Sequence, residues 1–334
     1  MLYLPVMYVL ITNHFVTRRQ YRRVFALAVV AISIQSVFAL VYYRSLPAVE
    51  RGLLESLTDH PASVTMNAVF LVLVCLLAFG GSKFYIWIVA VLTLPVAYAY
   101  LLSQRRAAMV AFFIGVLALL GVLFVRRKRL FWIITPTMIV LGLGFLAVTW
   151  NAAGAPGLPA TAVKTVMFPD QLNEVDQASS EYRDLEAYNL WFTIRGDPLS
   201  GIGFGQPFTV VRPMPDISFF EYWQYLPHNS VLWIWIKTGF FGFVTMLFLF
   251  GRALQHGART ALRVASPNDG AMVVVGFSYV VMFLVFAYVD IGWVARNTVF
   301  LALAFGLCAD FEQARADEEV TSGTAVPMRL PVPA

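Results

Sequence analysis

Long runs of apolar residues, separated by short polar or basic stretches, dominate this chain. Nine runs approach or reach the roughly 20 residues that cross a membrane as a helix. They are residues 2–17, 24–43, 63–79, 84–102, 107–125, 130–150, 229–250, 270–289 and 293–309. Apolar and polar residues do not alternate within these runs, as they would in the strands of a membrane barrel. The expected fold class is therefore all-α, a polytopic membrane helix bundle of about nine spans with one large periplasmic loop subdomain.

The composition agrees with a membrane protein and excludes two other classes. The 334 residues are 59% hydrophobic and 13% charged, whereas a soluble domain has roughly 25% charged residues. The net charge of +5 comes from basic residues near the helix ends, so no nucleic-acid partner is expected. Cys75 and Cys308 both lie inside apolar runs and indicate neither a disulfide framework nor a metal site.

The basic residues of the short loops predict the orientation of the chain. The stretch "RRQYRR" (18–23), Lys83, "RRKR" (126–129) and Arg252, Arg259 and Arg263 all fall on one side of the bundle. The positive-inside rule makes that side the cytoplasm. The other side carries residues 44–62, the "SQRR" turn, residues 151–228 and "DIGWVAR" (290–296), where Asp290 and Arg296 are expected to pair. Residues 1–17 are not expected to be a signal peptide, because their charges follow the apolar run.

Four regions follow from this topology. Residues 1–150 hold the first six spans, 151–228 form the periplasmic loop subdomain, 229–310 hold three more spans, and 311–334 are expected to be a disordered cytoplasmic tail. The loop has nine acidic and four basic residues, a net charge of −5, which suits a translocated segment. It opens with "AAGAPGLPA", too rich in Gly and Pro for a helix. The stretch "SSEYRDLEAYNLWFTIRGDP" predicts a helix, capped by Ser179 or Ser180 and ended by Gly196 and Pro198.

Two adjacent arginines on the outer side break the charge bias of the other short loops. Arg105 and Arg106 lie in a turn too short to leave the membrane interface. Such arginines either extend to lipid phosphates or bind another anion. For two neighbours in so short a turn, a bound anion for at least one is the favoured interpretation. The planar guanidinium matches phosphate oxygens, so the anion expected is a phosphate or pyrophosphate.

The remaining polar motifs are individually weak. His228 lies at the outer interface, where an imidazole suits a proton acceptor, although a lone histidine there is more often structural. Its neighbour Asn229 is explained by helix capping. Arg183 lies beside Asp184 and Glu186, and a surface ion pair accounts for it. The glycines of "IRGDPLSGIGFGQPF" predict a tight turn after a helix, because no strand precedes them as a dinucleotide fingerprint would require.

Taken together, the motifs resemble the bacterial O-antigen ligase/polymerase family of membrane glycosyltransferases. The resemblance runs from about residue 65 to 250. "SQRRAA" is similar to the family's arginine turn, "DPLSGIGFG" to its glycine turn after an arginine-bearing helix, and "HNSVLWIWIKTGFFG" to the end of its periplasmic loop. Family members usually carry more spans before the arginine turn, so the chain is expected to be a short member or to begin downstream of the full start.

The resemblance implies an inner-membrane enzyme with a periplasmic active face. It would move a glycan from undecaprenyl pyrophosphate to a hydroxyl of a glycan or lipid A-core acceptor, with inversion and without a metal or other cofactor. It implies catalytic roles for Arg106, Arg183 and His228 and substrate binding by Arg105, Arg195 and Asn229, among membrane lipids. The alternative is a transporter or flippase of a lipid-linked pyrophosphate glycan. The absence of a visible repeat and the gathering of charges at one face favour the enzyme.

Overall fold

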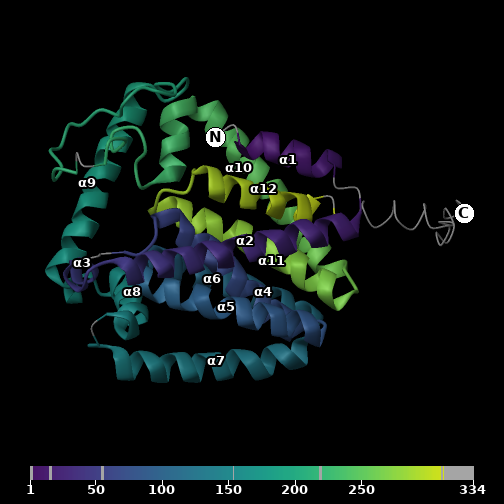
Figure 1. Cartoon of the computed structure of the whole chain (residues 1–334). Coiled ribbons are helices and arrows are strands. Elements are labelled where there is room, and N and C mark those ends of the chain that lie inside the picture. The colour runs from purple at the N-terminus through teal and green to yellow at the C-terminus, as the bar shows by residue number, and fades with distance from the viewer. Residues whose placement is uncertain are drawn as a thin grey trace, which may run out of the picture.

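A computed structural model of the chain describes residues 3–14, 17–53, 56–152, 154–217, 220–309 and 311, and these residues form helices and loops without strands. The helices and short 3-10 turns follow one another along the chain (Figure 1). Their bounds are α1 (Tyr3–His14), α2 (Arg18–Ser45), α3 (Ala48–Leu53), α4 (His60–Phe79), α5 (Lys83–Ser103), α6 (Arg106–Arg126), α7 (Lys128–Thr149), η1 (Ala155–Gly157), α8 (Leu158–Met167), η2 (Pro169–Gln171), α9 (Glu174–Gly196), α10 (Ser230–Arg263), α11 (Pro267–Val289) and α12 (Ala295–Ala309). The tail expected at 311–334 lies outside the described residues, apart from Phe311.

The helices confirm an all-α polytopic membrane bundle. Each of the nine predicted spans coincides with a helix, and within the described residues seven of these are long and apolar enough to cross a membrane. The other two, α1 and α12, have 12 and 15 residues and are shorter than a full crossing. The expectation of nine full spans is therefore supported for seven helices.

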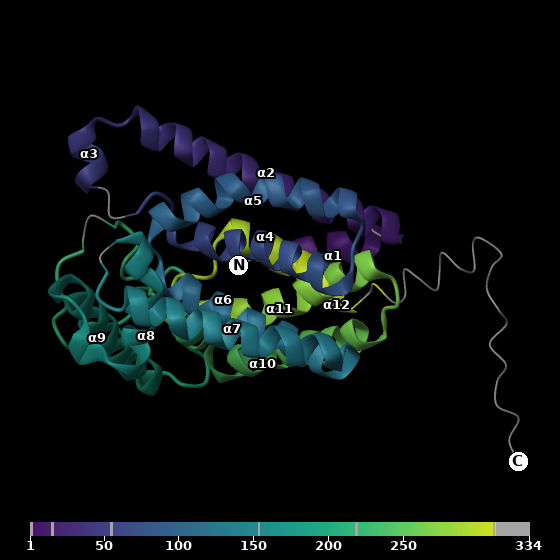
Figure 2. The same ribbon diagram turned by 90° about the horizontal axis from the view of Figure 1, so that it is seen from below.

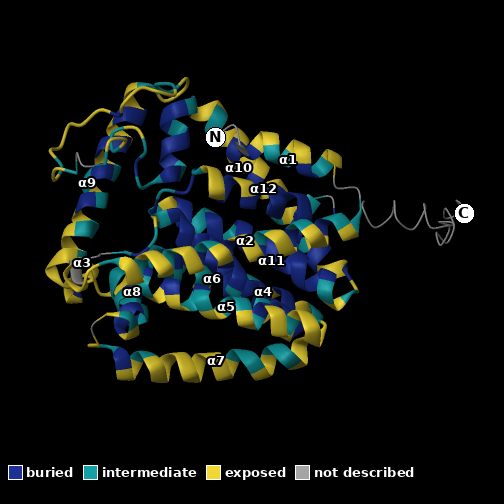
Figure 3. Ribbon diagram, in the orientation of Figure 1, coloured by how far each residue is buried: buried dark blue, intermediate teal, exposed yellow. Residues whose placement is uncertain are grey.

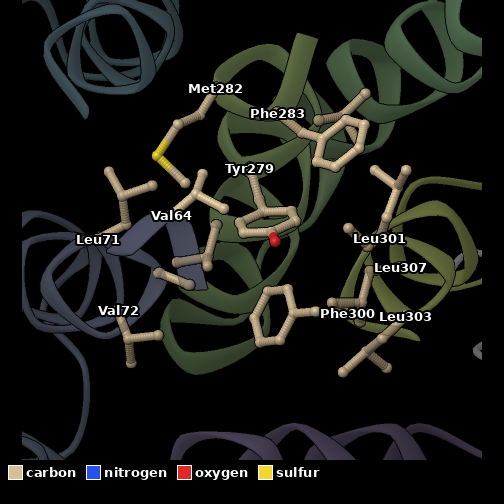
Figure 4. Packing of buried hydrophobic residues seen from close by; sticks show 14 of the residues in the cluster. Val64, Leu71, Val72, Tyr279, Met282, Phe283, Phe300, Leu301, Leu303 and Leu307 are labelled. Carbon is tan, nitrogen blue, oxygen red and sulfur yellow. The ribbon is translucent and has the colours of Figure 1, made fainter. Parts of the chain in front are cut away.

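Helices α4 and α11 form the centre of the bundle. Their apolar windows are largely buried, whereas none of the window of α7 is buried. The exposed α7 is visible as the yellow helix along the edge of the bundle in Figure 3. Tyr279 and Phe283 of α11 pack between Val64 of α4 and Leu301 of α12 (Figure 4). A helix that is apolar on all sides is stable at the centre of the bundle because every face meets another helix. At the edge of the bundle it is stable because its outer face meets lipid.

The basic short loops gather at one end of the bundle, as the sequence predicts. Arg22 forms a two-pronged ion pair with the buried Asp269 at 2.6 and 2.7 Å, joining the starts of α2 and α11. Arg126 donates to the carbonyls that end α10, and Arg127 donates to those of Ala78 and Phe79 at the end of α4. Arg126 and Arg127 therefore satisfy helix C-termini, which carry partial negative charge.

The opposite end, away from the basic loops, carries α3, α8 and α9, with α3 apart from the other two (Figure 2). The expected helix in the 151–228 region is confirmed as α9, but two details of that prediction are wrong. The cap is Asn173, whose side chain accepts the Asp176 N–H at 2.8 Å, so the helix begins five residues before Ser179. Helix α8 also begins inside "AAGAPGLPA", because Pro159 occupies its first turn, where a missing N–H costs nothing.

The glycine-rich turn after α9 interlocks with a break in α10. Gly239 has φ +66° inside α10, and a Cβ there would lie 2.0 Å from the Leu199 carbonyl oxygen. A Cβ on Gly201, at φ +68°, would lie 2.5 Å from the Gly239 backbone nitrogen, while the Ile202 N–H bonds the Ile236 carbonyl at 2.7 Å. Only glycine permits this backbone conformation and this approach. The turn predicted from the sequence is confirmed, and its role is to seat the loop region on α10.

Candidate active site

His228 stands just before α10, held by the buried carboxylate of Glu186 from α9. One Glu186 oxygen accepts the His228 backbone N–H at 2.8 Å, and the other lies 3.2 Å from the ring Nδ1. The Glu186 side chain is 2% exposed, whereas that of His228 is 18% exposed. A buried carboxylate on Nδ1 fixes the ring and its tautomer, which leaves Nε2 as the nitrogen available for proton transfer.

The phenol ring of Tyr182 also lies against His228. The two ring centroids are 5.6 Å apart and nearly perpendicular. Burial, and then the neighbouring Glu186 carboxylate, raise the pKa of the Tyr182 phenol well above its usual value. Tyr182 therefore stays neutral, and its ring and Glu186 together restrict the orientation of the imidazole.

A second histidine–carboxylate pair lies next to the first. His60, the first residue of α4, places Nδ1 2.8 and 2.9 Å from the two oxygens of Asp290, which follows α11. The expected Asp290–Arg296 pair is wrong, since Arg296 instead bonds Asp59 at 2.9 Å. Asp290 turns inward at the end of α11 and is buried, whereas the Arg296 pair is exposed at the surface.

The surroundings of Asp290 favour its charged form. Burial alone raises the pKa of the Asp290 carboxyl, but the His60 hydrogen bond and the positive charges of His60, His228 and Arg183 outweigh it. The result is a pKa of about 2, below the ordinary 3.8. The carboxylate is therefore ionised at any physiological pH, held by the His60 hydrogen bond and by the nearby charge of Arg183.

Arg106 begins α6 and points toward α8 and α9. Its guanidinium donates to the Thr165 hydroxyl at 2.9 Å and contacts the Asp176 carboxylate at 3.1 Å. The side chain is only 13% exposed. The anion that contacts Arg106 in this structure is thus a carboxylate of the chain itself, and the bound phosphate or pyrophosphate expected from the sequence stays a prediction.

Arg183 links the arginine turn to the histidines. Its charge acts on both Arg106 and Asp290, and its Nε is buried without a hydrogen-bond partner in the described part of the chain. The suggested surface pair with Glu186 is replaced by the Glu186–His228 contact. Two guanidinium groups close enough to repel each other mark a place where an anion is favourable.

The histidine rings complete the grouping. The His60 and His228 centroids are 5.9 Å apart. The chain therefore brings together three of its predicted site residues, namely Arg106, Arg183 and His228, from segments more than 40 residues apart. Sequence reasoning did not single out His60 as a site residue. Its only signal is a histidine before a proline at the start of an apolar run on the outer side.

The other predicted residues lie at the margins of this group. Arg105 is half-buried at the cap position of α6, beside Arg106. Asn229 accepts the Leu232 N–H at 2.9 Å and caps α10, the structural account that the sequence also allowed. Arg195 is exposed near the end of α9, 12 residues or about 18 Å along the helix from Arg183. The structure does not bring Arg195 to the histidines.

Comparison with known proteins gives two matches. The profile of the O-antigen ligase family matches residues 88–247, which span the arginine turn, α9, the glycine turn and the first half of α10. An O-antigen ligase of Salmonella typhimurium (strain LT2) is 27% identical over 141 residues, which cover 39% of this chain and 35% of that protein. The aligned part thus spans about a third of that relative's length. Over residues 88–247 the chain is therefore similar to the O-antigen ligase family.

Proposed function

We propose that this protein transfers a glycan from undecaprenyl pyrophosphate to an acceptor hydroxyl on the periplasmic face of the inner membrane. The convergence of Arg106 and Arg183 beside His228 carries the proposal. The basic loops lie at the other end of the bundle, which the positive-inside rule places in the cytoplasm. The family match supports the class of reaction, with either a lipid A-core or a second lipid-linked glycan as acceptor.

In this proposal the two arginines stabilise the leaving pyrophosphate. The bond between the anomeric carbon and the phosphate oxygen breaks, and its electron pair leaves with the lipid pyrophosphate. Each guanidinium offers several N–H donors in a plane, which suits neighbouring phosphate oxygens. Donors that are already in place when charge develops are the most effective electrostatic contribution to catalysis.

His228 takes the proton of the acceptor hydroxyl. The acceptor oxygen forms its bond to the anomeric carbon while the proton passes to Nε2, the ring nitrogen that Glu186 leaves available. Attack from the face opposite the leaving group inverts the anomeric centre. The carboxylate of Glu186 then stabilises the imidazolium, as the buried acid does in a Ser-His-Asp triad.

The experiment separates binding from transfer. The purified protein is given an undecaprenyl-pyrophosphate-linked glycan with lipid A-core, or with a second molecule of the same donor. We expect polymeric or core-linked product, and we expect His228→Ala to lower turnover by roughly 100- to 10,000-fold while the donor still binds. Movement of the donor between leaflets without any glycan transfer would instead support the transporter alternative.

Glycan profiles of a deletion strain distinguish the two kinds of acceptor. Loss of a ligase leaves lipid A-core without polymer and accumulates lipid-linked polymer. Loss of a polymerase leaves single repeat units.

A further inference from the structure

The His60–Asp290 pair has no role in the mechanism above, although it lies inside the same group. It joins the start of α4 to the turn after α11. Ser230 fixes that turn to the start of α10, since its hydroxyl donates to the Asp290 carbonyl at 3.0 Å and accepts the Gly292 N–H at 2.7 Å. The pair is therefore held rigidly against the segment that carries His228.

The contacts of Asp290 determine which ring nitrogen of His60 is free. Asp290 is 1% exposed and ionised, so its oxygens only accept hydrogen bonds. Both oxygens lie within 2.9 Å of His60 Nδ1, which is therefore the donor. Nε2 is the nitrogen left for a ligand, on a side chain that is 28% exposed.

The two histidine rings differ in how many carboxylate oxygens contact them and at what distance. Glu186 divides its oxygens between the His228 backbone N–H and a 3.2 Å contact to the ring. Asp290 places both oxygens on the His60 ring nitrogen at shorter distances. The His60 ring is therefore fixed by two short contacts to one carboxylate, whereas Glu186 shares its oxygens between the backbone and the ring of His228.

We propose that His60, oriented by Asp290, is a third hydrogen-bond donor to the lipid pyrophosphate, alongside Arg106 and Arg183. Between the Asp290 carboxylate on Nδ1 and a bound pyrophosphate on Nε2, the ring meets an acceptor at each nitrogen and donates to both. The His60 ring touches that of His228, and the charge of Arg183 acts on its partner Asp290. His60 therefore lies beside the proposed proton acceptor, and its partner Asp290 lies within the electrostatic reach of Arg183. The inference rests on the proposed function in that it requires a pyrophosphate ligand in this site.

The test measures binding of undecaprenyl pyrophosphate without a sugar to the detergent-purified protein. His60→Asn keeps a donor near Nδ1 for Asp290 but loses the Nε2 donor, so we expect affinity to fall about 10- to 100-fold, as for a lost charge-assisted hydrogen bond. His60→Gln places an amide near Nε2 and should bind more tightly than His60→Asn. Asp290→Asn removes the charge with little change in size and should also weaken binding. Arg296→Gln, at the nearby exposed pair with Asp59, is the matched control and should bind as the parent does.

Several outcomes would overturn the role of His60. They are parental affinity in His60→Asn, weaker binding in His60→Gln than in His60→Asn, or parental affinity in an inserted Asp290→Asn. Weaker binding in His60→Gln than in His60→Asn would mean that only the Nδ1 contact with Asp290 matters and that the pair is structural. If His60→Asn inserts poorly, Asp290→Asn decides alone.

Failure of the proposed function would look different. If the variants bind the lipid in the expected order but the parent transfers no glycan, the role of His60 stands and the proposed enzymatic function is rejected. If the parent transfers glycan and His60→Asn equals it in binding and turnover, the proposed function stands and the role of His60 is rejected.

Discussion

Glu186→Gln tests whether the buried carboxylate sets the role of His228. In the parent, one Glu186 oxygen accepts the backbone N–H at 2.8 Å and the other faces Nδ1 at 3.2 Å. Glutamine has one oxygen and one NH2. The oxygen must take the backbone N–H, which can only donate, so the NH2 faces Nδ1 and forces it to accept. The ring proton then moves to Nε2, and the proton acceptor is lost.

The size of the effect follows from that change of tautomer. A general base contributes roughly 100- to 10,000-fold, and the corresponding acid-to-amide change in a Ser-His-Asp triad costs about 10,000-fold. We expect turnover to fall about 1,000-fold, or about 4 kcal/mol in activation free energy. Stability should change little, since a charge-assisted hydrogen bond is exchanged for a neutral one at a cost of about 1–2 kcal/mol.

The assay compares glycan transfer and donor binding in detergent-purified protein. Asp184→Asn is the matched control, because it removes an exposed carboxylate two residues away on the same helix. We expect parental transfer in that control and normal donor binding in both variants. Parental turnover in Glu186→Gln would refute the assignment of His228 as an oriented proton acceptor.

Four further predictions concern other parts of the proposal. Arg106→Lys and Arg106→Ala should each lose roughly 100-fold or more of transfer while inserting normally, because an ammonium lacks the planar fork; if Arg105→Ala loses transfer instead, the key arginine is its neighbour. Ser200→Cys should react with a membrane-impermeant thiol reagent in intact spheroplasts against a low background, since Cys75 and Cys308 are buried, and labelling only after lysis contradicts the orientation. Transfer should continue in EDTA, because arginines carry the charge stabilisation, and a loss restored by magnesium or manganese contradicts that role. The pKa of Asp290 is lowered to about 2 from 3.8, which should contribute about 2 kcal/mol to the stability of the folded protein. This stability is present above pH ~4 and is lost as the pH falls toward ~2. The thermal unfolding temperatures of the parent and Asp290→Asn should therefore differ above this pH window and converge below it.

The spans were predictable because a membrane demands uninterrupted apolar length, and all nine runs became helices. The start of α9 could not be predicted, because several possible capping residues lie within one polar stretch. Asn173 and Ser179 are both good caps, and only the contact of Asn173 with Asp176 decides between them. The first turn of α8 was missed because proline breaks a helix interior but suits its first turn.

Within the candidate site, Arg106, Arg183 and His228 were predictable from motif order, but their carboxylate partners were not. His60 and Asp290 are 230 residues apart, and no local pattern connects them. The nearby Arg296 looked like the natural partner of Asp290. The end of α11 instead directs the carboxylate inward, while Arg296 reaches outward to Asp59. Long-range pairs of this kind depend on how the helices pack.

The part of α10 before the break at Gly239 packs in two cores. Leu232 and Ile236 pack in a small core with Leu190 and Ile194 of α9, whereas Trp233 and Ile234 pack in the main bundle, as Phe250 does beyond the break. A chimera that exchanged only residues 151–228 would leave half of that small core facing foreign side chains. A graft of this region should therefore extend through the outer part of α10 to Gly239 and keep Trp233 and Ile234, which face the main bundle.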